Sequence, residues 1–199
     1  MNVFGLFPIP LGVEVLDYNE SIDFTKIEWL ELDRKEIDQN FIGKSKVSKN
    51  YKILKKYSSL NKKIHTAISD YIHNTLCLKR DFQIVSSWMT KTETGCESYF
   101  HSHTNCWLSA CFYFDHGSPI KFQRQRESFT DSAVTSYNAF NSQTWDVPPQ
   151  KNLLLIFPSH VEHKIERNES DVPRYSLAIN ILPKGNFGKG DSEFYWPSF

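Results

Sequence analysis

The spacing of apolar residues along this chain changes near residue 80. Before that point, residues 58–78 place apolar side chains three and four positions apart, which predicts an α-helix with one apolar stripe. Ser58 or Ser59 can cap its start, and Lys79 and Arg80 at its end complement the helix dipole. The stripe consists of Leu60, Ile64, Ala67, Ile68, Tyr71, Ile72 and Leu76.

After the helix, the pattern favours short strands separated by turn residues. The segment 107–114 is apolar on both faces, which predicts a central strand. One helix followed by at least five short strands predicts a mainly β fold with a supporting helix. Its core would be a double-stranded β-helix of the jelly-roll or cupin-like kind. The predicted strands are residues 82–89, 107–114, 120–123, 153–157 and 175–182.

Three further segments have weaker patterns. Residues 3–16 are apolar but contain Pro8 and Pro10. Because proline removes a donor from the hydrogen-bond ladder, this segment is predicted to be an extended edge strand. Residues 17–50 mix short apolar runs with charge and fit either a helix or a loop. Residues 127–149 are polar without a period, which predicts a long loop over the sheet that could serve as a substrate lid.

Length and composition are those of a soluble globular protein. The 199 residues suffice for one domain with a substantial core. We expect a single domain over residues 1–199, with its core at about residues 82–183. The aromatic-rich tail is expected to pack over a sheet edge, and exposed strand edges would allow a homodimer.

Charge and hydropathy exclude several classes of partner. The net charge of +0 creates no global field that would attract nucleic acid or an anionic membrane. No apolar run has the eighteen or more residues that a membrane span needs. The N-terminus does not resemble a secretory signal, so we expect a cytoplasmic protein whose four cysteines are reduced thiols.

Candidate metal chemistry lies at His101 and His103. On a strand, residues i and i+2 project from the same face, so both imidazoles can bind one metal ion. A third ligand must come from elsewhere, and His163 follows a predicted strand that could bring it within reach. Imidazole suits iron, zinc, copper and nickel, so these ligands alone do not identify the metal. A His-x-His pair is also common as two solvated side chains.

Arg174 strengthens the case for a site. It follows His163 by eleven residues and begins an otherwise apolar strand. A buried guanidinium requires an anionic partner, because an unpaired buried charge is very costly. Its planar fork binds a carboxylate through two hydrogen bonds, and Ser176 on the same strand face can add a third donor. The alternative partner is a protein carboxylate such as Asp171.

With these motifs, the region from about Trp88 to Ile181 resembles the Fe(II)/2-oxoglutarate-dependent dioxygenase superfamily. More narrowly, it resembles 2-oxoglutarate oxygenases of marine bacteria and cyanobacterial phages. The N-terminal Leu-Phe-Pro-Ile-Pro at 6–10 is similar to the opening of that family. The motifs that carry the resemblance are the His-x-His at 101–103, the segment 108–114, Leu-Ile-Phe-Pro-Ser at 155–159, His163, Arg-Tyr-Ser at 174–176 and Asn180.

The resemblance implies Fe(II) bound by His101, His103 and His163. One position departs from the superfamily, whose usual triad is His-x-Asp/Glu with a distal histidine. A neutral imidazole at His103 leaves more positive charge on the metal than a carboxylate would. Glu97 is an alternative source of the carboxylate, although four residues is a long step from His101 for one metal site.

The resemblance also implies a co-substrate and a reaction. 2-Oxoglutarate would chelate the iron, and its far carboxylate would meet Arg174 and Ser176, with Tyr113 as a further candidate for that contact. The enzyme would hydroxylate a peptide side chain, with prolyl hydroxylation as the family-level analogy, or a small metabolite. Succinate and CO2 would be released. If phage-encoded, the protein would work in the host cytoplasm.

Two other functions remain open at this point. The first is a cupin-like three-histidine metalloenzyme that does not use 2-oxoglutarate, such as a thiol dioxygenase, in which Arg174 would bind the carboxylate of the substrate. The second is a non-catalytic jelly-roll binding module whose histidines are structural. Fold alone does not choose among these functions.

Overall fold

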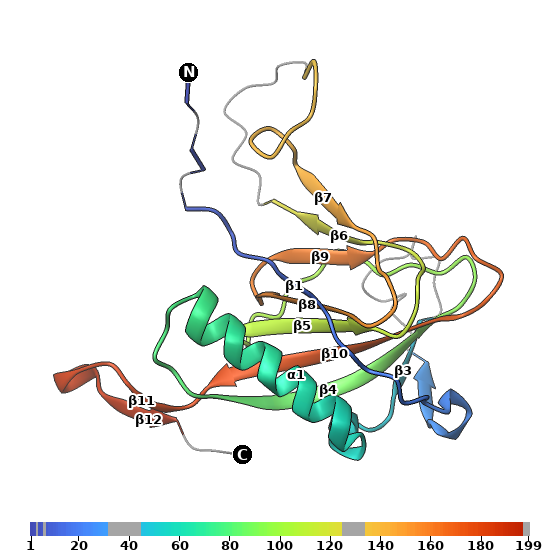
Figure 1. The fold of residues 1–199 in the computed structure, drawn as a ribbon, viewed down its shortest axis with the longest axis horizontal. Coiled ribbons are helices and arrows are strands. Elements are labelled where there is room, and N and C mark those ends of the chain that lie inside the picture. Colours follow the sequence, from blue (N-terminus) through green and yellow to red (C-terminus); the bar gives the residue numbers. More distant parts are fainter. Residues whose placement is uncertain (3, 6, 32–44, 125–133, 197–199) are drawn as a thin grey trace.

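The computed structural model describes residues 1–2, 4–5, 7–31, 45–124 and 134–196. Strands dominate this part of the chain, and one long helix lies across them (Figure 1). The strands are β1 (Gly12–Val15), β2 (Trp29–Glu31), β3 (Ser45–Ser48), β4 (Phe82–Thr92), β5 (Leu108–Tyr113), β6 (Ile120–Gln123), β7 (Thr144–Val147), β8 (Leu153–Pro158), β9 (Glu162–Ile165), β10 (Arg174–Pro183), β11 (Gly185–Phe187) and β12 (Phe194–Trp196).

The strands form a large and a small antiparallel sheet. The large sheet has seven strands in the order β1-β8-β5-β10-β4-β3-β2, and the small sheet has the order β7-β6-β9. This is the mainly β jelly-roll arrangement predicted from the sequence. β5 is an internal strand and all six of its residues are buried, as the two-sided apolar pattern of 107–114 predicts.

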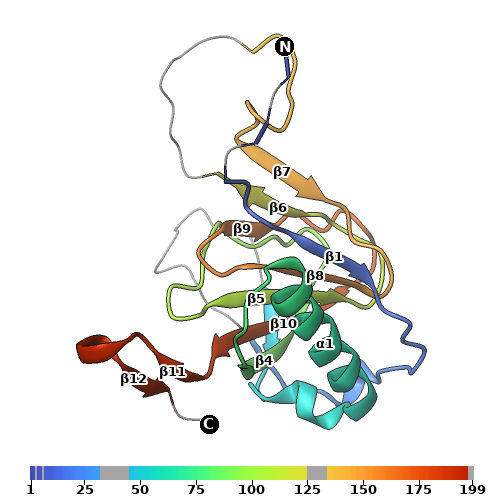
Figure 2. The same ribbon diagram turned by 60° about the vertical axis from the view of Figure 1, so that its left-hand side comes forward.

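The helix α1 (Ser58–Asp70) covers one face of the large sheet (Figures 1 and 2). Its buried residues are Leu60, Ile64, Ala67 and Ile68, and they pack with alternate residues of the strands, such as Phe112 of β5. A single π-helical turn, η3 (Tyr71–Thr75), continues the helix. The predicted helix over 58–78 is therefore present, although it ends three residues earlier.

The small sheet packs on the opposite face. Successive residues of a strand point to opposite sides, so Cys111 and Tyr113 of β5 face away from α1. These two side chains join Leu155 and Phe157 of β8 in a second apolar cluster, which contains Ile120 of the small sheet. The large and small sheets therefore form a sandwich. The second apolar cluster fills part of the inner space between them.

Several predictions about local structure were wrong. Neither Ser58 nor Ser59 caps the helix: Tyr57 is the N-cap residue and makes no side-chain cap hydrogen bond. The region 127–149 is not loop throughout, because Thr144–Val147 forms strand β7 and pairs with β6; residues 125–133 lie outside the described part. The tail does not cover a sheet edge but forms its own hairpin, β11–β12, which projects from the body (Figure 2).

The N-terminal half contains structure that its sequence did not resolve. Of residues 3–16, only Gly12–Val15 forms a strand, β1, and it lies at the edge of the large sheet as predicted. Within 17–50, β2 and β3 extend the other edge of that sheet. None of the helices in the described part of the chain has the length and apolarity needed to cross a membrane.

We predict that Ile64→Ala destabilises the protein by about 2–5 kcal/mol, because it removes a fully buried side chain from the helix–sheet core and leaves a cavity. Urea unfolding followed by circular dichroism measures the loss. The exposed Lys62→Ala on the same helix is the control and should change stability by less than about 0.5 kcal/mol. Equal effects of the two substitutions would show that the face of α1 has been assigned wrongly.

Candidate metal centre and co-substrate pocket

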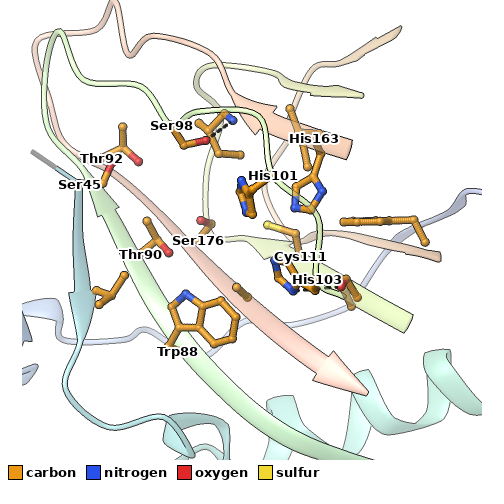
Figure 3. A pocket seen from close by; sticks show the side chains of 17 residues that line it. Ser45, Trp88, Thr90, Thr92, Ser98, His101, His103, Cys111, His163 and Ser176 are labelled. Atoms are coloured by element: carbon orange, nitrogen blue, oxygen red, sulfur yellow. Dashed lines mark hydrogen bonds between the residues drawn. The ribbon is translucent and has the colours of Figure 1, made fainter. Parts of the chain in front are cut away.

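Three imidazoles converge between the two sheets. One potential ligand atom from each of His101, His103 and His163 lies within 4.8 Å of the others, and Figure 3 shows the rings facing one another. The structure therefore brings together all three histidines predicted from the sequence as metal ligands. The ring centroids of His101 and His163 are 4.5 Å apart.

Backbone pairing explains how residues sixty positions apart meet. The N–H of His101 donates to the carbonyl of His163 over 3.1 Å, and the N–H of His163 donates back over 2.9 Å. His163 follows β8, as predicted, and lies within β9, a strand that was not predicted. His103 lies outside any strand, where its N–H donates to the carbonyl of Ser159 at 2.9 Å. The strand-parity argument for His101 and His103 was thus right about direction but not about secondary structure.

Each ring is oriented by a hydrogen bond at Nδ1. The Nδ1 of His101 lies 2.9 Å from the carbonyl oxygen of Tyr99, and that of His163 lies 2.9 Å from the carbonyl oxygen of Val161. A carbonyl only accepts, so Nδ1 must carry the proton in both rings. Nε2 is then the atom that each ring offers to a metal, as is usual for histidine ligands with an outer hydrogen-bond partner.

His103 has a side-chain partner in place of a carbonyl. Its Nδ1 is 2.6 Å from Oδ1 of Asn180 on β10 and 3.3 Å from Oγ of Ser109. Ser109 in turn shares a hydrogen bond of 2.9 Å with Ser159. The pairing of β10 with β4 shifts register directly after Asn180. This network holds the third ring with neutral groups only.

The surroundings of His163 favour its neutral form. Burial, with a smaller contribution from the neighbouring His101, lowers the pKa of His163 to about 3. His163 is therefore uncharged at neutral pH, which is the form that binds metal. The donor set consists of three neutral nitrogen atoms, which is compatible with iron, as well as with zinc, copper or nickel.

Arg174 lies deep in the same inner space without a partner. It is 4% exposed, and all three of its guanidinium nitrogens are buried without a hydrogen bond to any described residue. The guanidinium carbon sits 4.6 Å above the ring of Tyr113, whose hydroxyl likewise lacks a described partner. Asp171, the alternative protein partner, forms no ion pair with Arg174. Burial raises the pKa of Tyr113 well above its usual range, so this hydroxyl remains a neutral donor.

The strand register aligns these donors with the histidines. Arg174, Ser176 and Asn180 alternate along β10 and so share one face of the sheet, and Ser176 pairs directly with Tyr113. A side chain at Gly117 would place its Cβ 2.8 Å from Cδ of Arg174, so a glycine there leaves room for the arginine stem. This face of β10 therefore carries the guanidinium of Arg174 and the hydroxyl of Ser176 at one end, and at the other end Asn180, which contacts His103.

A cavity of about 120 Å³ lies between the three histidines and Ser176; the lining of this cavity does not include Arg174 or Tyr113. Its lining includes the three histidines, Cys111, Ser176, Ile120 and Phe157. Figure 3 shows Cys111 and Ser176 between the histidines and the far side of the pocket. Small and apolar side chains thus wall the cavity between the three histidines and Ser176, which lies on the same strand face as Arg174.

Two other sequence predictions can be compared with the structure. Glu97 is not part of the cluster, because its carboxylate pairs with Lys164 at 3.1 Å. Asn180 appeared in the sequence only as part of a motif, and its contact with His103 was missed. The alternation of Trp88 and Thr90 along β4 could have marked these residues as pocket-lining, but nothing local distinguishes that face from an ordinary half-buried one.

Comparison with protein families gives one match. Residues 86–180 match the sequence model of a family described as "Putative 2OG-Fe(II) oxygenase". The match contains all three histidines, Arg174 and Ser176. No curated protein matches the sequence.

Solved structures share the fold at low sequence identity. A 2OG-Fe(II) oxygenase family oxidoreductase from Burkholderia pseudomallei has a TM-score of 0.52 at 8% identity, covering 74% of this chain and 75% of its own. HygX from Streptomyces hygroscopicus, with nickel, 2-oxoglutarate and hygromycin B bound, gives 0.53 at 10% identity over 80% and 74%. The epimerase SnoN of nogalamycin biosynthesis, in complex with Fe3+, alpha ketoglutarate and nogalamycin RO, gives 0.58 at 11% over 87% and 72%. These similarities establish a common fold.

We predict that His163→Ala abolishes stoichiometric binding of Fe(II) or of Ni(II) as a redox-stable substitute, because two imidazoles no longer surround the ion. Anaerobic calorimetric titration measures the binding. His160→Ala, which changes an exposed histidine three residues away, should bind metal as the wild type does. Unchanged binding by His163→Ala would place the metal elsewhere.

Asn180→Leu is expected to weaken metal binding about 10- to 100-fold, the usual effect of losing an outer partner of a ligating histidine. The leucine has a similar volume but cannot accept the Nδ1 proton of His103. Asn180→Asp keeps an acceptor and should retain binding. If Asn180→Leu binds metal with wild-type affinity, the hydrogen bond does not position the ligand.

Proposed function

We propose that this chain is a 2OG-Fe(II) oxygenase, because residues 86–180 match the model of that family, that His101, His103 and His163 bind its iron, and that it oxidises a small molecule. The chemistry of the family requires Fe(II) and 2-oxoglutarate. We further propose that residues 1–199 form a single domain around a core at about 82–183.

The observation that carries the assignment of the co-substrate site is the unpaired guanidinium of Arg174. A buried cation is strongly unfavourable without a counter-ion, and no described residue supplies one, so we infer that the site binds an anion from outside the chain. A carboxylate matches the planar fork, and the hydroxyls of Tyr113 and Ser176 supply further donors. The cavity then continues toward the three histidines. A dicarboxylic keto acid, with one end at Arg174 and the other at the metal, fits this geometry.

The donor set fits the iron as well. Each imidazole is held by a hydrogen bond at Nδ1, so the ligands need little rearrangement. Three facial ligands leave positions for a chelating co-substrate and for oxygen. When bound, Fe(II) and 2-oxoglutarate supply the oxidising chemistry with O2, with release of succinate and CO2.

The remaining residues of the pocket act through position and exclusion of water. Arg174, Tyr113 and Ser176 orient the co-substrate, and the side chains of Ile120 and Phe157 exclude water from the space beside it. In such a dry site the charge-assisted hydrogen bonds from the guanidinium are stronger than in water.

A small-molecule substrate is supported by two fold relatives: the structure of HygX has hygromycin B bound, and that of SnoN has nogalamycin RO bound. These compounds are ligands of those proteins. For this chain we propose only the coarser class, oxidation of a small molecule. Hydroxylation of a peptide side chain, including proline, is the competing proposal, and the two are separated by the substrate experiments below.

We predict that anaerobic Fe(II) and 2-oxoglutarate together give the visible charge-transfer band of the chelate, and that Arg174→Ala raises the Kd for 2-oxoglutarate about 30- to 100-fold, because hydrogen bonds to a charged group are lost. The control is Arg167→Ala, whose exposed guanidinium pairs with Glu169. Bound iron without a band would favour a three-histidine metalloenzyme that does not use 2-oxoglutarate. Absence of iron binding would leave a non-catalytic module.

A further inference from the structure

The inner faces of β3 and β4 form a part of the pocket that neither the metal nor the co-substrate uses. Five of their residues line the cavity, and we refer to them as the β3–β4 wall: Ser45, Val47, Trp88, Thr90 and Thr92. Figure 3 labels Ser45, Trp88, Thr90 and Thr92 on the side of the pocket away from His163. None of the five belongs to either apolar core cluster.

The reason lies in the layout of the sheets. Inner-face residues of β5 and β8 are covered by the small sheet, as the cluster of Cys111, Phe157 and Ile120 shows. β3 and β4 lie beyond β10 in the large sheet, and no strand of the small sheet pairs or clusters with them. Within the described chain, this wall therefore borders the cavity next to the three histidines. It is the surface available to a substrate.

The wall offers hydrogen bonds at a regular spacing. Trp88 and Thr90 are two residues apart on one strand, so their polar groups lie roughly 7 Å apart along it. Trp88 is beside the metal cluster, with its ring centroid 6.0 Å from that of His103. Neither the indole N–H nor the hydroxyl of Thr90 forms a hydrogen bond with another residue of the described chain. The indole ring and Val47 add apolar surface between these polar groups.

The wall carries no charge, although its strands do. Lys46 and Lys91 are paired across β3 and β4 and point to the opposite face, where they form ion pairs with Glu31 and Glu93. The inner face of the same two strands presents only hydroxyl, indole and aliphatic groups. Arg174, the cation beside the wall, pairs with Thr92 across β10 and β4 but is assigned to the co-substrate. A charged substrate group on the wall would then lose its hydration without gaining a counter-ion, which is strongly unfavourable.

The wall also does not favour a peptide bound as an added strand. That mode of binding needs an exposed sheet edge with unpaired backbone groups. β4 is hydrogen-bonded to β10 on one side and to β3 on the other. Recognition on this wall therefore depends on side-chain hydroxyl and indole groups, which suit the hydroxyls of a small molecule.

We propose that the substrate is an uncharged, polyhydroxylated ring compound, of the sugar or cyclitol class, bound against the β3–β4 wall with its reactive carbon beside the metal. This inference rests on the proposed function, because it assigns the substrate of the same iron site. Trp88 and Thr90 are the specificity-determining residues, and the C–H face of the ring lies against the indole and Val47.

The test uses the full chain loaded anaerobically with Fe(II) and 2-oxoglutarate. Neutral methyl glycosides and myo-inositol are titrated in, and the shift of the charge-transfer band gives a Kd. Glucose 6-phosphate and glucosamine are sugar analogues that carry a negative and a positive charge, respectively. An end-blocked proline tripeptide represents the peptide class. Succinate formed in air is measured for each compound.

We expect at least one neutral compound to shift the band and stimulate succinate formation, with charged analogues at least about 10-fold weaker. Trp88→Phe and Thr90→Val should each raise its Kd about 2- to 10-fold, the effect of one lost neutral hydrogen bond. Thr66→Val, the same change at an exposed position of α1, is the matched control. The affinity for 2-oxoglutarate should stay unchanged in all three variants.

The outcomes distinguish the two proposals. If the wild-type protein with Fe(II) and 2-oxoglutarate shows no charge-transfer band before any compound is added, the proposed function itself is contradicted. With the band intact, tighter binding of a charged analogue, stimulation by the proline tripeptide alone, or no response to any neutral compound would overturn the assignment of the substrate. Equal affinities in Trp88→Phe, Thr90→Val and Thr66→Val would show that the wall does not bind the substrate.

Discussion

The site depends on the two backbone hydrogen bonds that join His101 to His163. They connect an irregular segment after β4 to strand β9 of the small sheet. Together with the bonds between Ser98 and Ile165 and from His103 to Ser159, this bridge fixes the His-x-His segment relative to the third imidazole. The large sheet then completes the cluster through Asn180, whose side chain holds His103. The candidate metal centre therefore lies at the junction of the two sheets, and neither sheet alone would form it.

Charge organises the inner space around this junction. Arg174 is buried at one end without a hydrogen-bonding partner among the described residues, while three imidazoles occupy the other. Imidazole ligands would leave a bound Fe(II) its full charge of two, so that iron and guanidinium together would carry three positive charges, of which a doubly charged keto acid would balance two. A carboxylate at position 103 would alter that balance. The three-histidine set and the isolated arginine are consistent with each other, because both leave the negative charge to the co-substrate.

The same strands carry two chemically different faces. β4 contributes Met89 to the core beneath α1 and Trp88 to the pocket, and Lys91 sits between Thr90 and Thr92 on the opposite side. Because successive residues of a strand point to opposite faces, neighbouring residues of β4 serve either the core or the pocket. A substitution in β4 affects one or the other depending only on its parity.

The sequence by itself determined the helix over 58–78, the main strands, and the residue types of the site, because the period of apolar positions and the chemistry of histidine and arginine are local properties. It did not determine β9, the hairpin β11–β12 or the Asn180–His103 contact. These depend on register between strands far apart in the chain, where a shift of one residue reverses every side chain. Whether Arg174 would meet Asp171 or remain unpaired was likewise decided by the tertiary structure, since burial and the positions of neighbouring charges exist only once the two sheets have packed.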